Sequence, residues 1–133
     1  EEYYGEYGIM GRNGRGILMN VDNALTTGLF KNSKLEGLCH FFDMKTNRKY
    51  IGYFRKGRRV GNAIVEYIDE GVIWYGRILD QGIEKSNDNE EDEEEKELIG
   101  EGVFIVRFTG EKVFEGKVNF SKKEDDEIVK KAK

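Results

Sequence analysis

Residues Tyr50 to Ala63 read YIGYFRKGRRVGNA, a stretch that alternates large and small residues before a basic turn. Tyr50, Gly52 and Phe54 stand two positions apart, which is the side-chain period of a β-strand and not of a helix. After the turn, Gly61 and Ala63 lead into a second strand-like run, IVEYI. The stretch therefore predicts one β-hairpin.

The same pattern returns along the chain in units that begin near residues 3, 26, 50, 74 and 114. The starts are separated by 23, 24, 24 and 40 residues, and removing an acidic insertion of about 16 residues returns the last gap to a solenoid-type period. We therefore expect an all-β fold, an elongated and curved single-layer ladder of about five antiparallel β-hairpins over residues 1–120.

A glycine between two large residues on one strand face leaves room for rings to stack from unit to unit. We expect one continuous stripe formed by Tyr3, Tyr7, Phe30, Tyr50, Phe54, Trp74, Ile78, Phe114 and Val118. Small residues in the second strand of each unit would allow close approach of the opposing strand, at positions 14, 16, 37, 39, 61, 63, 100 and 102.

Two segments depart from the repeat. From Glu84 to Glu97 the sequence EKSNDNEEDEEEKE holds nine acidic residues and two lysines, so residues 83–98 are expected to form a solvated, flexible loop. We expect this loop to lie beside Arg58 and Arg59 and to neutralise them in part. Residues 121–133 predict a short C-terminal helix from about 122 to 132, which begins with a capping box at Ser121. We expect this helix either to cover the last unit weakly or to fray.

The pattern Y-x-G-x-[FW]-x-x-G-x-x-x-G-x-G resembles the MORN repeat (membrane occupation and recognition nexus). YIGYFRKGRRVGNA matches it at every marked position except Ala63, whereas Met10, Thr26, Ser33 and Cys39 depart from it in the first two units. The resemblance implies scaffolding of protein assemblies, often cytoskeletal, ciliary or membrane-associated. It also implies that some members bind phospholipid or are joined to an enzyme domain.

Composition excludes several classes of site. Cys39 is the single cysteine and His40 the single histidine, and neighbours on a strand point to opposite faces, which disfavours a catalytic pair. One Cys and one His cannot build a closed zinc site, no EF-hand pattern occurs, and GRNGRG at 11–16 lacks the ending of a phosphate loop. We expect a non-enzymatic protein with no catalytic residue, metal or cofactor.

The compartment and the broad class of partner follow from the same inventory. The absence of a second cysteine favours a cytoplasmic location, and the chain contains no apolar run long enough to span a membrane. The start EEYYGEYG has no initiator methionine, which suggests a processed chain or a fragment. A pI near 5.2 disfavours nucleic acid as a ligand.

Two surfaces are candidate binding sites. A protein partner is expected along the ring stripe, with stacking inside the sheet as the alternative interpretation, and the proposed anchors are Tyr7, Phe30, Tyr50, Phe54, Trp74 and Tyr75. Anionic phospholipid is the alternative ligand, bound at the row of turns by Lys31, Lys34, Arg55, Lys56, Arg58 and Arg59. A regulatory module of a larger enzyme, and a homodimer paired through edge strands, are further alternatives.

Overall fold

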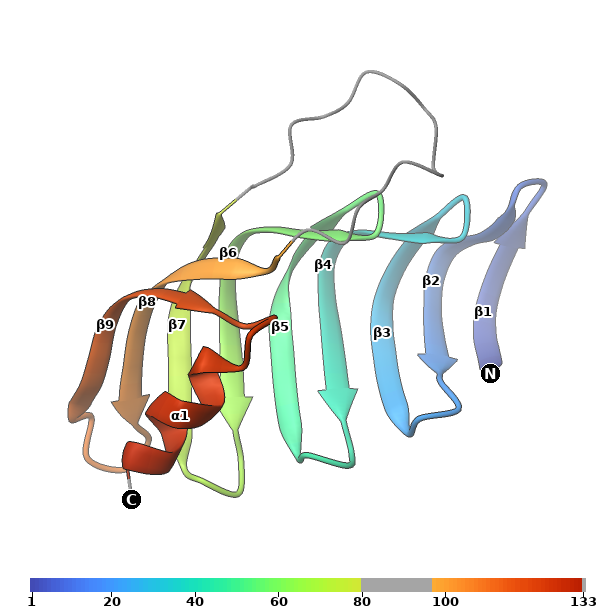
Figure 1. The fold of residues 1–133 in the computed structure, drawn as a ribbon. Helices are drawn as coiled ribbons and strands as arrows, with labels where there is room; N and C mark the ends of the chain where they lie inside the picture. The colour runs from blue at the N-terminus through green and yellow to red at the C-terminus, as the bar shows by residue number, and fades with distance from the viewer. Residues whose placement is uncertain (80–96, 133) are drawn as a thin grey trace.

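The fold is a single antiparallel sheet in which each strand pairs with its neighbours in sequence, followed by one short helix (Figure 1). The computed structural model describes residues 1–79 and 97–132, and most of the predicted insertion 83–98 lies outside this range. The elements are β1 (Glu2–Gly8), β2 (Gly11–Met19), β3 (Ala24–Lys31), β4 (Lys34–Asp43), β5 (Arg48–Arg55), β6 (Arg58–Tyr67), β7 (Val72–Leu79), β8 (Ile99–Val106), β9 (Lys112–Asn119) and α1 (Glu124–Lys131).

The predicted all-β ladder with a C-terminal helix is confirmed. Strands β1 to β8 form four antiparallel pairs, one for each of the first four units. Strand β9 begins the fifth unit, but the chain then continues into α1 and not into a second strand. The fifth predicted hairpin is thus a strand and a helix.

A row of glycines and other small residues crosses the whole sheet. It consists of Gly5, Gly16, Gly28, Cys39, Gly52, Ala63, Gly76, Gly102 and Gly116. Aromatic rings lie directly on this row, since a methyl group added at Gly76 would sit 2.6 Å from the ring of Trp74. The rings can occupy these positions because the residue beneath them has no side chain.

A second set of glycines bends the strands. Gly14, Gly37 and Gly61 have φ angles of 103°, 79° and 70°, which an L-residue with a side chain adopts only with strain. All three lie where β2, β4 and β6 hold extra residues relative to their partner strands. Such bulges increase the local bend of a strand. In Figure 1 several strands curve over toward the viewer, which gives the sheet a trough-like form.

The two sides of the sheet differ in burial. The inner face carries the first-position rings and their neighbours, among them Tyr3, Phe30, Tyr50, Trp74 and Phe104. The outer face carries the residues between them, among them Tyr4, Ile17, Ile51, Ile64 and Tyr75. The core lies on the inner face, where Trp74, Tyr67 and Phe104 have no exposed surface. The outer face is open to solvent.

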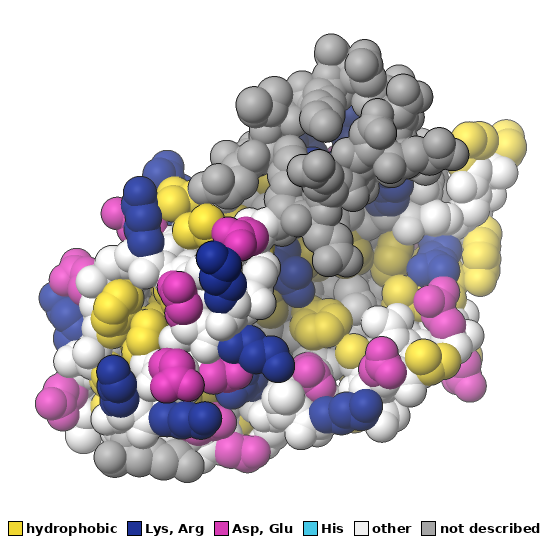
Figure 2. All heavy atoms as spheres, in the orientation of Figure 1, with side chains coloured by type: hydrophobic (Ala, Val, Ile, Leu, Met, Phe, Trp, Pro, Cys, Tyr) yellow, Lys and Arg dark blue, Asp and Glu magenta, His cyan; other side chains and the backbone are white. Residues whose placement is uncertain are grey.

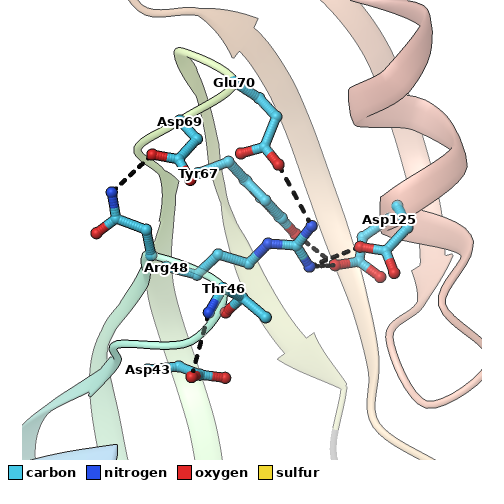
Figure 3. Close-up of polar contacts among 9 residues, drawn as sticks. Asp43, Thr46, Arg48, Tyr67, Asp69, Glu70 and Asp125 are labelled. Carbon is cyan, nitrogen blue, oxygen red and sulfur yellow. Dashed lines mark hydrogen bonds and ion pairs between the residues drawn. The ribbon is translucent and has the colours of Figure 1, made fainter.

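Helix α1 lies against the inner face and reaches back to strands far from it in sequence. Val129 is 1% exposed and packs into the core. The Tyr67 hydroxyl donates a 2.7 Å hydrogen bond to Asp125, and Arg48 forms an ion pair of 2.6 Å with Asp126 (Figure 3 shows the surrounding contacts). The helix is therefore docked on the sheet.

The predicted capping box at Ser121 is not formed. The Ser121 hydroxyl instead accepts a 2.8 Å hydrogen bond from the Leu98 amide, which joins the chain after β9 to the residue before β8. Lys123 precedes the helix in the left-handed region, at φ 58°, without a side-chain cap. The helix starts at Glu124 because Ser121 is used between strands.

Candidate functional site

A groove of about 330 Å³ opens on the inner face in front of β4, β5 and β6, beside α1. Its apolar wall is formed by Phe41, Tyr50, Val65, Leu98 and Phe120. Charged residues lie at both of its ends along the strands. Figure 2 shows hydrophobic side chains on this side of the molecule among Lys, Arg, Asp and Glu side chains.

At one end of the groove, Arg48 is surrounded by acidic side chains (Figure 3). Its guanidinium lies 3.8 Å from an oxygen of Asp125, 3.7 Å from one of Glu70, and 4.7 Å from the centre of the Tyr67 ring. Burial raises the pKa of Asp125, and the carboxylate of Asp126 raises it further, against the opposing effect of the Tyr67 hydrogen bond. At this end one arginine is therefore shared among three carboxyl groups, two of which belong to the helix.

At the other end, Arg59 lies over three aromatic rings. Its guanidinium carbon is 4.7 Å from the centre of the Tyr50 ring, 5.7 Å from that of Phe54 and 5.8 Å from that of Phe41. Contacts of this kind favour the charged form. Burial acts in the opposite direction and lowers the pKa of Arg59 from its usual range. The group keeps its charge at neutral pH, because an arginine pKa starts far above it.

Two polar atoms at this end have no hydrogen-bond partner among the residues that the structure describes. The Nε of Arg59 and the hydroxyl oxygen of Tyr50 are both buried without a hydrogen bond. Burial also raises the pKa of Tyr50 to about 12, so its phenol is protonated at neutral pH and is able to donate. Within residues 1–79 and 97–132, Arg59 forms no ion pair with a carboxylate. This end of the groove therefore holds a positive charge and unused donors.

The structure places most of the predicted ring anchors inside the fold. Phe30, Tyr50, Phe54 and Trp74 are buried. Burial favours the alternative interpretation for these four rings, namely stacking inside the sheet. A part of Tyr50 still lines the groove.

The remaining two predicted anchors are exposed, but they do not lie together. Tyr7 is on the edge strand β1, where its ring contacts Tyr3 at 5.0 Å between centres. Tyr75 follows Trp74 on β7, so it points to the outer face and is 55% exposed. The six predicted anchors therefore do not form one surface.

The predicted basic turns are brought together by the fold. Lys31, Lys34, Arg55, Lys56 and Arg58 are exposed at the β3–β4 and β5–β6 turns. The two turns stack through a 2.9 Å hydrogen bond from the Gly57 amide to the Leu35 carbonyl. Arg59 separates from this group, because it pairs with Phe54 and therefore lies on the inner face.

Sequence reasoning missed two features. One is the groove itself, whose residue Arg59 could have been placed by strand alternation, because Arg58 and Arg59 must point to opposite faces. The other is a band of exposed apolar side chains on the outer face, where Ile51, Ile64 and Tyr75 are cross-strand neighbours. The signal for the band was the apolar residue that follows the first ring in several units.

Other classes of site receive no support from the described residues. Among residues 1–79 and 97–132, no three His, Cys, Asp or Glu side chains gather as a metal-binding group. No helix of this part of the chain is long and apolar enough to cross a membrane. Comparison of the sequence with protein-family models and with curated proteins finds no match. The repeat spacing and the geometry of the groove are therefore the observations that bear on function.

Proposed function

We propose that this protein is a non-enzymatic scaffold of the MORN-repeat type, which binds an extended segment of a protein partner in the inner-face groove. The observation that carries the proposal is the groove itself, an apolar hollow with charged ends on the inner face of the sheet. The repeat of about 24 residues and the row of small residues across the sheet support the MORN assignment. The partner assembly is of the cytoplasmic, cytoskeletal, ciliary or membrane-associated kind that this resemblance implies.

The groove suits a peptide better than a large globular surface. A volume of about 330 Å³ matches the lower end of small-ligand sites, so it holds a few side chains at most. Phe41 and Phe120 supply apolar contact area, and Arg59 supplies a charge that orients the bound segment. Aromatic and arginine side chains in such hollows contribute most of the binding energy in known interfaces.

The proposal is tested by selecting short peptides from a displayed random library on the whole chain. Affinities of the selected peptides are then measured by fluorescence anisotropy for the wild type, for Phe41→Ala in the groove and for Ile64→Ala on the outer face. Circular dichroism checks that both variants fold. We expect Phe41→Ala to weaken binding by about tenfold or more, and Ile64→Ala to leave it unchanged. Failure to select any binder, or the reverse pattern of losses, contradicts the proposal.

A second function, attachment to anionic membranes through the basic turns, is favoured by the stacking of two turns that carry five exposed basic residues. Near an anionic surface each such residue contributes about 1 kcal/mol. Sedimentation with phosphatidylserine vesicles should fall when Lys31 and Lys56 are both replaced by serine, and should fall steeply as salt is raised. Sedimentation that is insensitive to both changes excludes this function.

A further inference from the structure

The residue that covers the inner-face rings occupies the same place in every complete unit. It stands two positions before the first glycine of the small-x-small triplet in each unit, at positions 14, 37, 61 and 100. The residue is Arg12, Leu35, Arg59 or Leu98. Leu35 pairs with Phe30, and Arg59 pairs in the same way with Phe54. Leu35 and Leu98 both pack against the buried core. A leucine therefore suffices for the fold at this place, and the charge of an arginine is not required by it.

The two arginines differ in how their charge is neutralised. Arg12 lies over Tyr3 and Phe30, at 5.4 and 5.9 Å, and also forms an ion pair with Glu1. Arg59 lies over rings in the same manner but forms no ion pair within the described residues. A guanidinium held partly out of water without an anion is costly, and ring contacts offset only a part of that cost.

The unused donors lie beside the unneutralised charge. Tyr50 is 7% exposed, its hydroxyl has no hydrogen-bond partner in the described part of the chain, and its ring is the one closest to the Arg59 guanidinium. The Nε of Arg59 also lacks a partner within residues 1–79 and 97–132, and both side chains line the groove. Buried donors in native proteins are usually paired, so two neighbouring unpaired donors indicate a missing acceptor. Arg59 is half-buried, so a ligand in the groove can reach it.

We infer that the Arg59 end of the groove is a carboxylate-binding subsite, which takes an Asp or Glu side chain of the partner segment. The inference rests on the proposed function. A carboxylate accepts hydrogen bonds from two guanidinium N–H groups at once and supplies a negative charge, which Arg59 does not meet among the described residues. An apolar neighbour in the same segment packs on Phe41 and Val65.

The far end of the groove argues against a lipid phosphate as the occupant. Asp43 and Asp125 line it there, and the arginine of this end, Arg48, is already in an ion pair of 2.6 Å with Asp126, so it offers no unpaired positive charge to a phosphate. A carboxylate bound at the Arg59 end is separated from these residues along the strands. Arg59 lies near the β5–β6 turn, whereas Tyr67 lies at the opposite end of β6. The partner is thus a peptide in which one acidic residue adjoins an apolar one.

The test uses the peptides selected on the whole chain, each with a matched copy in which glutamate or aspartate is replaced by its amide. Affinities are measured for the wild type, for Arg59→Leu and for the control Arg12→Leu. Leucine is chosen because the repeat already accepts it at this place. We expect amide replacement to weaken binding to the wild type and to Arg12→Leu by about tenfold to a hundredfold, and to leave binding to Arg59→Leu unchanged. We also expect Arg59→Lys to keep only part of the affinity, because lysine lacks the planar fork.

A second readout uses the wild type alone. The Nε–H resonance of Arg59 in a nitrogen-15 spectrum should shift with the acidic peptide and not with its amide copy. Selected peptides without acidic residues, or equal losses on amide replacement in the wild type and in Arg59→Leu, overturn the subsite. If Phe41→Ala still weakens those peptides, the scaffold proposal stands while the subsite falls. If phosphatidylserine vesicles bind in an Arg59-dependent way and no acidic peptide does, the ligand is a lipid and the inference is wrong.

Discussion

Replacing Asp125 by alanine should destabilise the fold by about 2 kcal/mol. The Tyr67 side chain has no exposed surface, and its hydroxyl donates a 2.7 Å hydrogen bond to Asp125. Loss of the acceptor leaves a buried hydroxyl unpaired, which costs about 1 to 3 kcal/mol. The contact of 3.8 Å between Arg48 and Asp125 is long and adds less than about 1 kcal/mol. Removing a buried carboxyl group also removes its desolvation cost, which offsets a part of this loss of stability. We therefore expect a value near the middle of the range of about 1 to 3 kcal/mol.

Urea unfolding followed by circular dichroism measures the change, with Tyr67→Phe and the double variant completing a cycle. Tyr67→Phe should cost about 1 kcal/mol, because it removes the donor and leaves Asp125 paired with Arg48. The double variant should cost less than the sum of the two, since neither partner is then left unpaired. A value for Asp125→Ala within about 0.3 kcal/mol of the wild type, or strict additivity, would refute the docking of α1 through this bond.

Three further predictions concern the sheet, the helix start and pH. Gly76→Ala should cost about 3 kcal/mol or more in urea unfolding, because the new methyl group would meet the backbone carbonyl oxygen of Glu101 on β8 and would lie 2.6 Å from the Trp74 ring. Gly110→Ala meets no atom within 4 Å and should cost only the strain of its φ of 73°, about 1 kcal/mol. Equal losses would contradict the close packing of ring and neighbouring strand at the small-residue row. Lys123→Gly should raise the melting temperature, because glycine relieves about 1 kcal/mol at a φ of 58°; a lower melting temperature would contradict this. The folded pKa of Asp125 is raised above its ordinary 3.8, so the folded state binds this proton more tightly, and the contribution of this group to stability falls as pH rises between the two values. Asp125→Asn should remove that part of the slope of unfolding free energy against pH, and an unchanged slope would show that the shift is absent.

The sheet could be predicted because its information is local. Tyr50, Gly52 and Phe54 alternate within one strand, and the spacing of about 24 residues repeats that strand along the chain. A repeat in which each unit contacts its neighbours leaves little choice of topology. The row of small residues followed from the same spacing. The bulges at Gly14, Gly37 and Gly61 explain why the pattern needs a further glycine.

The groove could not be predicted because it depends on contacts between distant parts of the chain. Tyr67 and Asp125 are 58 positions apart, and no local pattern states that α1 folds back over β5 and β6. Ser121 was expected to cap the helix, but its hydroxyl instead accepts a hydrogen bond from the amide of Leu98, on a neighbouring segment. Local capping preferences yield to such contacts when a helix end is close to another strand.

The burial of the rings could not be predicted from the sequence either. Trp74 stands in the same pattern as Tyr3, yet the Trp74 end of the sheet is covered by α1 and by Phe120, whose ring lies 5.0 Å from it. The sequence showed which rings share a face and left open whether that face is covered. The basic residue Arg59 is a different case, since strand alternation alone separates it from Arg58.

The most direct test of partner binding in the groove is a nitrogen-15 chemical-shift map of the whole chain with a selected acidic peptide. We predict that the largest shifts fall on the amides of Phe41, Tyr50 and Arg59, around the groove. Shifts confined to the outer-face strand positions of Ile64 and Tyr75 would contradict the account and place binding on the opposite side of the sheet.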